Sequence, residues 1–197
     1  VGTDDCTSWL WDLERGEAIG QLIGHSNSPV CLDVDWASQR ALTGATDKTA
    51  RLWDIESGET LLELKGHASF VRCVAADWTC QLALSGSNDK TMLLWDLESG
   101  EAIRIFRGHE GVVECVDADW NSQHALSGSL DKTLRLWDIT CGKTLRQFTG
   151  HTNGVRSLAV DWACHYALSG SRDATLRLWD LDGPEMQPLK TLRGHLQ

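Results

Sequence analysis

The chain has 197 residues, of which 42% are hydrophobic and 23% are charged, and its formal net charge is −10. This composition is typical of a soluble globular protein, and no stretch approaches the run of about 20 apolar residues that would span a bilayer. The negative charge disfavours non-specific binding to nucleic acid and to anionic membranes, so we expect neither as a partner.

Residues 1–23 contain two short runs rich in Trp, Leu and Ile, which "LERGE" separates. Such runs predict two β-strands joined by a turn. Asp5 and Trp11 align with Asp89 and Trp95 of the longer unit that follows. The first two strands of that unit have no counterpart here, so residues 1–23 are predicted to form half of one unit.

A repeat of 42 residues fills the rest of the chain. "ALTGATDKTARLWD" at residues 41–54 recurs with small changes at residues 83–96, 125–138 and 167–180. Gly-His pairs begin at residues 24, 66, 108, 150 and 194. Self-similarity at such a period predicts a repeat architecture. The predicted repeats are residues 24–65, 66–107, 108–149 and 150–193, and residues 194–197 start a further one.

The repeat at residues 108–149 contains four predicted strands. "VVECVDADW", "HALSGS", "TLRLWDI" and "KTLRQFTG" are β-favouring runs separated by Gly, Asn, Asp and Ser. In the third run, Leu134 and Leu136 fall on one face, and Arg135 and Trp137 fall on the other. Both faces are partly apolar, so neighbouring copies of the sheet are expected to cover them.

The last repeat contains an irregular segment, "LDGPEMQPLK" at residues 181–190, which is two residues longer than its counterparts. We favour a tolerated loop insertion, because surface connections vary freely. The alternative is a contact at the outer edge of the repeat.

Seven cysteines make an odd number, and Cys31, Cys73 and Cys115 recur at the repeat period. These three are predicted to be small core residues of one strand. The sequence has no Cys-x-x-Cys pair, which argues against a zinc site or redox motif, and we expect no metal and no cofactor. A reducing compartment, the cytoplasm, is the expected location, and the N-terminus is expected to be truncated.

The spacing of Gly-His and Trp-Asp pairs in these four-stranded units closely resembles the WD-repeat β-propeller family. The resemblance implies an all-β fold of four-stranded antiparallel blades over residues 1–197, as a single propeller region with four complete blades plus a half blade. One departure is a Trp and a short polar link after the first strand, where such repeats often have Phe and a Ser-Pro-Asp-Gly turn. These tryptophans are Trp36, Trp78, Trp120 and Trp162.

The half blade raises the question of how the ring closes. In a closed ring, the two ends would share one blade, with His195 near Asp5 and Trp11. We expect part of a larger ring, or a piece that closes through self-association. The competing prediction is a four-bladed ring with the N-terminal hairpin packed on its rim.

The resemblance also assigns one hydrogen-bonded set to each repeat. An indole N–H can donate to a hydroxyl, the hydroxyl to one imidazole nitrogen, and the other imidazole N–H to a carboxylate. Thr43 keeps the hydroxyl of Ser85, whereas the other candidate, Ser87, becomes Ala45, so Ser85 and its counterparts are the predicted members. The sets are His25, Thr43, Asp47, Trp53; His67, Ser85, Asp89, Trp95; His109, Ser127, Asp131, Trp137; and His151, Ser169, Asp173, Trp179.

Ser, His and Asp together also suggest a hydrolase. An active site needs one nucleophile in one cleft, whereas four equivalent sets imply four equivalent structural roles. We therefore predict no enzyme activity and no catalytic residue, and a hydrolase that uses one set is the less favoured alternative.

WD-repeat propellers resemble one another as rigid platforms that bind peptides or protein domains, usually at the narrow end of the ring. The resemblance implies that three positions per repeat face that surface: the third and fifth residues after the network histidine, and the residue before the network aspartate. We call these positions the rim, and they differ in every repeat, as selectivity requires. They are Ser28, Val30, Thr46; Phe70, Arg72, Asn88; Val112, Glu114, Leu130; and Gly154, Arg156, Arg172.

We expect the rim to bind an acidic or phosphorylated peptide through Arg72, Arg156 and Arg172, because guanidinium groups suit carboxylate and phosphate. Phe70, Val112 and Leu130 would add apolar contact. One alternative is that these arginines are solvated and pair with nearby acids such as Glu114. Another is a neutral or basic peptide drawn to an acidic surface that includes Asp33, Asp117 and Asp119.

Overall fold

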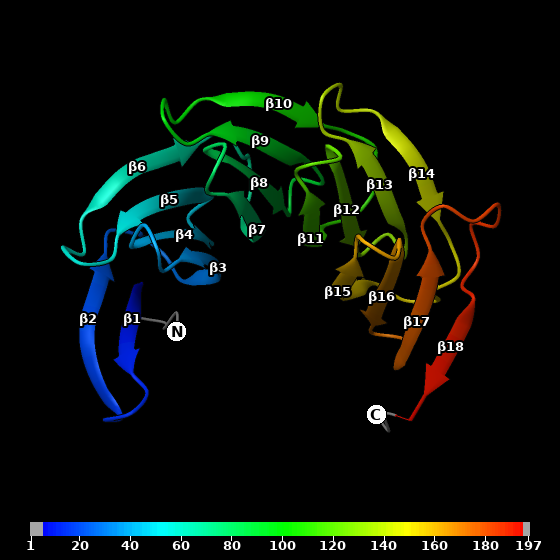
Figure 1. The fold of residues 1–197 in the computed structure, drawn as a ribbon, viewed down its shortest axis with the longest axis horizontal. Helices are drawn as coiled ribbons and strands as arrows, with labels where there is room; N and C mark the ends of the chain where they lie inside the picture. The colour runs from blue at the N-terminus through cyan, green and yellow to red at the C-terminus, as the bar shows by residue number, and fades with distance from the viewer. Residues whose placement is uncertain (1–5, 195–197) are drawn as a thin grey trace. The chain divides into compact units, whose positions relative to one another are not determined.

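A computed structural model describes residues 6–194, in which 18 β-strands form four four-stranded sheets and one two-stranded sheet (Figure 1). The described residues contain no α-helix. This confirms the predicted all-β fold of β-propeller blades, with four complete blades and a half blade. Asp5, His195 and residues 195–197 lie outside the described residues, so the arrangement expected at the two ends stays a prediction.

The strands follow the predicted repeats closely. The half blade consists of β1 (Thr7–Asp12) and β2 (Glu17–Ile23). The first complete blade contains β3 (Pro29–Asp35), β4 (Arg40–Ala45), β5 (Thr49–Asp54) and β6 (Thr60–Lys65). The second contains β7 (Val71–Asp77), β8 (Leu82–Ser87), β9 (Met92–Asp96) and β10 (Ala102–Phe106). The third contains β11 (Val113–Asp119), β12 (His124–Ser129), β13 (Leu134–Asp138) and β14 (Thr144–Phe148). The fourth contains β15 (Val155–Asp161), β16 (Tyr166–Ser171), β17 (Thr175–Asp180) and β18 (Lys190–Arg193).

The chain divides into two compact units. The first unit extends to Ser87 and includes Leu93–Arg104, and the second contains Asn88–Met92 and the residues from Ile105 onward.

Both faces of the third strand carry buried residues in β5, β9 and β13, as the alternation predicts, whereas in β17 one of the two faces is half-buried. In β13, Leu134, Leu136 and Trp137 are all buried. Leu136 lies opposite Leu126 and Trp137 lies opposite Ala125 in the antiparallel register of β12 and β13. The small Ala125 of the second strand therefore leaves room for the indole of Trp137 on the third.

A glycine closes the turn between the third and fourth strands. Gly142 has a φ of 73°, which lies in the left-handed region that favours glycine. Its N–H donates to the carbonyl of Asp138 at 2.8 Å, and Gly58 and Gly100 make the same bond in their blades. The "SGE" and "CGK" turns of the repeats are thus set by backbone geometry.

Within each unit, the first strand of one complete blade packs on the first two strands of the complete blade before it. In the first unit, β7 packs on β3 and β4, and in the second unit β15 packs on β11 and β12. Val74 and Trp78 pack against the apolar cluster that contains Leu42 and Leu52. The largest buried side chains are the four tryptophans Trp53, Trp95, Trp137 and Trp179.

The three periodic cysteines lie on the first strands. Cys73 is buried, whereas Cys31 and Cys115 are half-buried. Burial raises the pKa of the Cys31 and Cys115 thiols to about 12. These thiols are therefore protonated at neutral pH and act as small packing groups.

The insertion in the last blade contacts β14. The Arg146 guanidinium donates to the carbonyls of Asp182 and Gly183, and the Thr149 N–H donates to the Met186 carbonyl at 3.0 Å. Sequence reasoning favoured a tolerated loop insertion here, and these hydrogen bonds hold the insertion against the same blade. The alternative of a contact at the outer edge stays a prediction.

Candidate functional site

The first complete blade joins its histidine, threonine, aspartate and tryptophan. Trp53 Nε1 donates to Thr43 Oγ1 at 2.8 Å, and His25 Nε2 lies 2.7 Å from the same oxygen. Thr43 therefore donates its own proton to Nε2, which leaves the ring proton on Nδ1. His25 Nδ1 donates to Asp47 Oδ2 at 2.8 Å.

The same geometry recurs in the second unit. His109 bonds Asp131 at 2.7 Å and Ser127 at 2.8 Å, and Trp137 donates to Ser127 at 2.8 Å. The corresponding distances around His151 are 2.8, 2.7 and 2.8 Å, with Asp173, Ser169 and Trp179 as partners.

In the second blade, the members of the set fall in different units. The first unit contains the histidine, the hydroxyl and the tryptophan. Ser85 Oγ lies 2.7 Å from His67 Nε2 and accepts from Trp95 Nε1 at 2.7 Å. Asp89 belongs to the second unit, where it accepts from Thr91 Oγ1 at 2.6 Å. Ser85, and not Ser87, is the hydroxyl that contacts the histidine.

In each complete blade, a threonine also donates a hydrogen bond to the carboxylate of the network, and sequence reasoning missed this residue. Thr133 donates its hydroxyl to Asp131 Oδ1 at 2.6 Å and its N–H to the same oxygen at 3.0 Å. The Glu110 N–H donates to Asp131 Oδ2 at 3.0 Å. The signal was present, because a threonine follows the network aspartate by two residues in every repeat, at Thr49, Thr91, Thr133 and Thr175.

Burial and hydrogen bonds together set the charges of these groups. Burial lowers the pKa of His25 and of His151, against the opposing effect of their aspartate partners. Burial alone would raise the pKa of Asp131, but hydrogen bonds from His109 and Thr133 hold that pKa well below its usual range. For His25 and His151, a neutral ring beside an ionised aspartate fits the donor and acceptor roles found above.

The buried hydroxyls argue against the hydrolase alternative. Thr43, Ser85, Ser127 and Ser169 are at most 1% exposed, and each is engaged by an indole and an imidazole. A nucleophile must reach a substrate carbonyl, and a side chain closed off in this way cannot. These sets tie loops to strands.

The rim residues lie around these fixed loops. Val30, Arg156 and Arg172 are exposed, Gly154 is buried, and the other eight are half-buried: Ser28, Thr46, Phe70, Arg72, Asn88, Val112, Glu114 and Leu130.

Backbone hydrogen bonds bring rim residues together in three blades. The Thr46 N–H donates to the Ser28 carbonyl at 2.9 Å. Leu130 pairs in the same way with Val112 at 2.8 Å, and Arg172 pairs with Gly154 at 2.9 Å. In each of these blades, a backbone hydrogen bond therefore holds two of the three rim residues next to each other.

The three rim arginines differ in their surroundings. The Arg72 guanidinium lies over the Phe70 ring, 5.8 Å from its centroid. Arg156 Nη1 lies 3.2 Å from Glu114 Oε2, and its side chain is 44% exposed. Arg172 is exposed. One alternative prediction is that the rim arginines are solvated and pair with nearby acids such as Glu114. The ion pair between Arg156 and Glu114 is the pair that this alternative predicts.

Two rim residues of the second unit, Leu130 and Gly154, pack against each other. A Cβ atom on Gly154 would lie 2.5 Å from Leu130 Cδ2, so only glycine lets Leu130 pack there. Gly154 is thus buried beneath Leu130, although its position in the repeat predicts a surface residue.

In the alternative prediction, Asp33, Asp117 and Asp119 attract a basic peptide. Two of the three form hydrogen bonds between blades. Asp33 Oδ2 accepts from the Ala76 N–H at 2.8 Å, and Asp117 Oδ1 accepts from Trp162 Nε1 at 3.0 Å. Both aspartates are half-buried and join adjacent blades within one unit. Asp119 accepts from Ser122 in the turn after β11.

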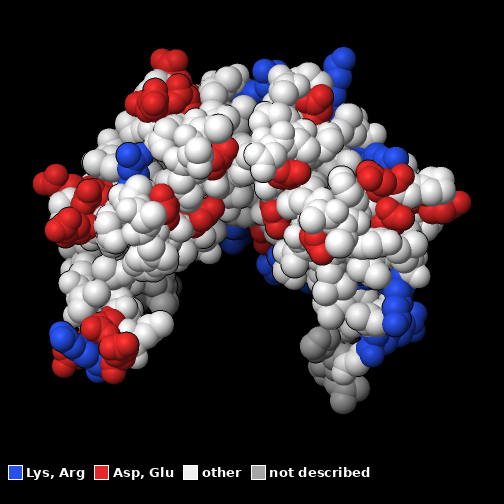
Figure 2. Space-filling model, viewed as in Figure 1, with Lys and Arg blue, Asp and Glu red and all other residues white. Residues whose placement is uncertain are grey.

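Charge is unevenly distributed on the face that Figure 2 shows. Asp and Glu side chains are spread over much of it, and Lys and Arg gather near β18. An anionic ligand would therefore be attracted only locally.

Within residues 6–194, no group of three His, Cys, Asp or Glu side chains is placed to hold a metal ion. That same part of the chain has no helix long and apolar enough to cross a membrane.

A family model described as WD domain, G-beta repeat, matches the chain four times, at residues 16–54, 58–96, 100–138 and 142–180. Together these matches cover well over half of the chain. Each ends at the Trp-Asp pair of a third strand, beside the network described above. No curated protein matches the chain.

Proposed function

The chain belongs to the WD40 repeat family, whose members generally act as protein-interaction scaffolds, and on that premise we propose that its rim binds an acidic or phosphorylated peptide. The platform is non-catalytic in this proposal. In the second unit, Arg156 and Arg172 provide the positive charge, and Val112 and Leu130 provide apolar contact. In the first unit, Arg72 and Phe70 offer the same two kinds of contact.

The observation that carries the proposal is the rim of the second unit. Arg172 is exposed and its N–H donates to the carbonyl of Gly154, on the loop directly before β15, and Arg156 is the second residue of β15. The network around His151 ties this loop to Asp173, the residue after Arg172. Because the backbone is already ordered, a ligand loses little binding energy to ordering it.

Glu114 adds a requirement on the ligand. Its carboxylate holds one nitrogen of the Arg156 guanidinium and is 10% exposed. A peptide anion must share or displace this contact. A phosphate, which has about two negative charges and three acceptor oxygens, does so better than a carboxylate. We therefore infer that phosphorylated peptides are preferred over acidic ones.

Fluorescence anisotropy with labelled phosphopeptides from an array tests the proposal. The double variant Arg156→Glu, Arg172→Glu should bind at least 10-fold more weakly. The variant Glu114→Gln should bind more tightly, because it removes the competing carboxylate. The matched control is Arg107→Glu, Lys143→Glu, which changes the net charge equally at two exposed positions outside the rim.

An unchanged affinity of the Arg156→Glu, Arg172→Glu variant would overturn the arginine rim and leave the scaffold itself in place. A preference of the parent for basic over phosphorylated peptides would favour the other class of ligand.

A further inference from the structure

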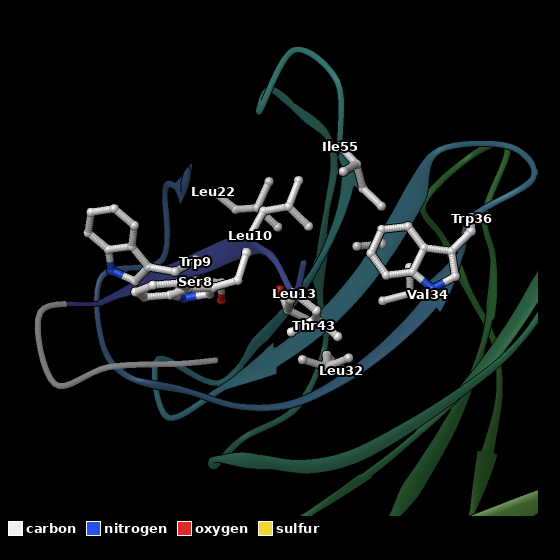
Figure 3. A pocket seen from close by; sticks show the side chains of 12 residues that line it. Ser8, Trp9, Leu10, Leu13, Leu22, Leu32, Val34, Trp36, Thr43 and Ile55 are labelled. Atoms are coloured by element: carbon white, nitrogen blue, oxygen red, sulfur yellow. The ribbon is translucent and has the colours of Figure 1, made fainter. Parts of the chain in front are cut away.

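A cavity of about 270 Å³ lies between the half blade and the first complete blade. Its walls are almost entirely apolar. Leu10 and Leu22 from β1 and β2 face Val34, Trp36 and Ile55 of the complete blade across the opening (Figure 3). All these residues belong to the first compact unit.

Large apolar side chains around this cavity are uncovered. Leu32 is 54% exposed and Trp36 is 60% exposed. The equivalent residues Leu158 and Trp162 on β15 are partly buried against the apolar cluster of their unit. Trp11 is 48% exposed, whereas its four equivalents in the complete blades are at most 1% exposed.

The other blades show what covers these positions. The face of β7 packs on β3 and β4, and the face of β15 packs on β11 and β12. In both cases, the cover consists of the first and second strands of the blade before. The cavity beside β3 is therefore the place of two such strands.

The half blade does not supply them, because it corresponds to the third and fourth strands. Gly16 N–H donates to the Asp12 carbonyl at 2.8 Å, as Gly58 does to Asp54 in the turn between β5 and β6. Within residues 6–194, every strand already belongs to one of the five sheets. No described segment is left to fill the cavity.

We propose that this cavity binds a two-stranded β-hairpin from another polypeptide chain. The hairpin packs alternating aliphatic side chains against Leu32, Val34 and Trp36, as β11 and β12 do against β15. This surface is separate from the rim.

The repeats also specify two polar groups of the hairpin. Its first strand carries a carboxylate that accepts from Trp36 Nε1, as Asp117 accepts from Trp162. Its second strand carries a hydroxyl that accepts from Trp11 Nε1, as Thr43 accepts from Trp53. A partner with aliphatic residues alone would leave both indoles without acceptors.

A complete blade of a second copy does not fit this place. Leu10 and Leu22 of the half blade already pack against the cluster of Ala41, Trp53 and Ile55. The third and fourth strands of an incoming blade would overlap β1 and β2. The occupant is therefore a hairpin without these outer strands.

The probe is a peptide with the sequence of residues 113–129, "VECVDADWNSQHALSGS", which contains both polar groups. It is titrated unlabelled into the ¹⁵N-labelled chain, and the indole N–H signals are followed by NMR. We expect the signals of Trp11 and Trp36 to shift, and that of Trp137 to stay in place. A peptide with Asp117→Ala should shift Trp11 but leave Trp36 less affected.

Protein variants give a second measurement. Trp36→Ala removes an exposed side chain, so the chain should still fold and should bind the peptide at least 10-fold more weakly. Tyr166→Ala is the matched control, because Tyr166 is an exposed aromatic residue that does not line the cavity. The double rim variant Arg156→Glu, Arg172→Glu should bind the hairpin as the parent does.

A free peptide can fail to bind because it does not form a hairpin alone. The same sequence is therefore also fused before Val1 through a flexible Gly-Ser linker, which raises its effective concentration to the millimolar range. Acrylamide quenching then reports whether the exposed indoles become covered. If neither the free nor the tethered peptide affects Trp11 and Trp36, or if Trp36→Ala binds equally well, the proposal is wrong.

Discussion

Replacing Asp131 by alanine removes the carboxylate that joins the loop before β11 to the turn before β13. Four hydrogen bonds are lost: from His109 Nδ1 at 2.7 Å, the Glu110 N–H at 3.0 Å, and the Thr133 hydroxyl and N–H at 2.6 and 3.0 Å. The donors of Glu110 and Thr133 can turn to water. The His109 side chain is 1% exposed and cannot.

The cost follows from this difference. Leaving a buried donor unsatisfied costs about 1–3 kcal/mol, and the partly hydrated bonds add a smaller amount each, so we expect a loss of about 3 kcal/mol in the free energy of unfolding. For a chain of this length, that is a fall of roughly 6–12 °C in melting temperature.

Urea unfolding followed by tryptophan fluorescence measures the change. The matched control is Asp138→Ala, which removes an aspartate that accepts from Thr140 and Cys141 in an exposed turn and should cost less than about 1 kcal/mol. If Asp131→Ala unfolds like Asp138→Ala, the carboxylate does not stabilise the blade in the way that we infer.

Three further predictions concern the network and the packing of the blades. Gly44→Ala would place a Cβ atom 2.5 Å from Val71 Cγ1 and should destabilise by about 1–3 kcal/mol in the same assay. Ser127→Ala leaves an indole and an imidazole without their shared partner and should cost about 2–4 kcal/mol, whereas threonine, which the first complete blade uses here, should cost less than about 1 kcal/mol. Because the pKa of His25 and His151 is lowered from 6.5 in the folded state, stability should be level above pH 6.5 and fall as the pH decreases below it. Unfolding curves between pH 5 and 8 check this, and a rise in stability on acidification would contradict it.

The strands and the hydroxyl of the network could be predicted because the sequences of the four repeats can be compared with one another. The change from Ser87 to Ala45 between two repeats singles out Ser85, and Ser85 is the residue that lies beside His67. The threonine two residues after the aspartate had an equally regular signal. It was missed because "DKT" reads as an ordinary turn, in which a hydroxyl needs no partner.

Contacts between side chains of different blades could not be predicted, because no pattern within one repeat indicates them. The bond from Trp162 to Asp117 depends on how closely two sheets approach, and no spacing along the chain gives that distance. The pairing of Arg156 with Glu114 likewise joins positions one period apart, on different blades. A rim position in the repeat also does not imply exposure. Gly154 occupies such a position but is buried beneath Leu130.

The aspartates that join adjacent blades bear on how near-identical repeats assemble in the right order. Repeat chains are prone to misassembly, because a segment of one copy can take the place of another. Asp33 and Asp117 stand at a position where the alternate blades have Ala75 and Ala159. Each aspartate accepts from the blade that follows it, and a copy with alanine at this position would leave the Trp162 indole without that acceptor. A substitution of one methyl group by a carboxylate in every second copy thus penalises the exchange of an aspartate copy for an alanine copy, while the shared tryptophans and histidines leave each blade the same inside.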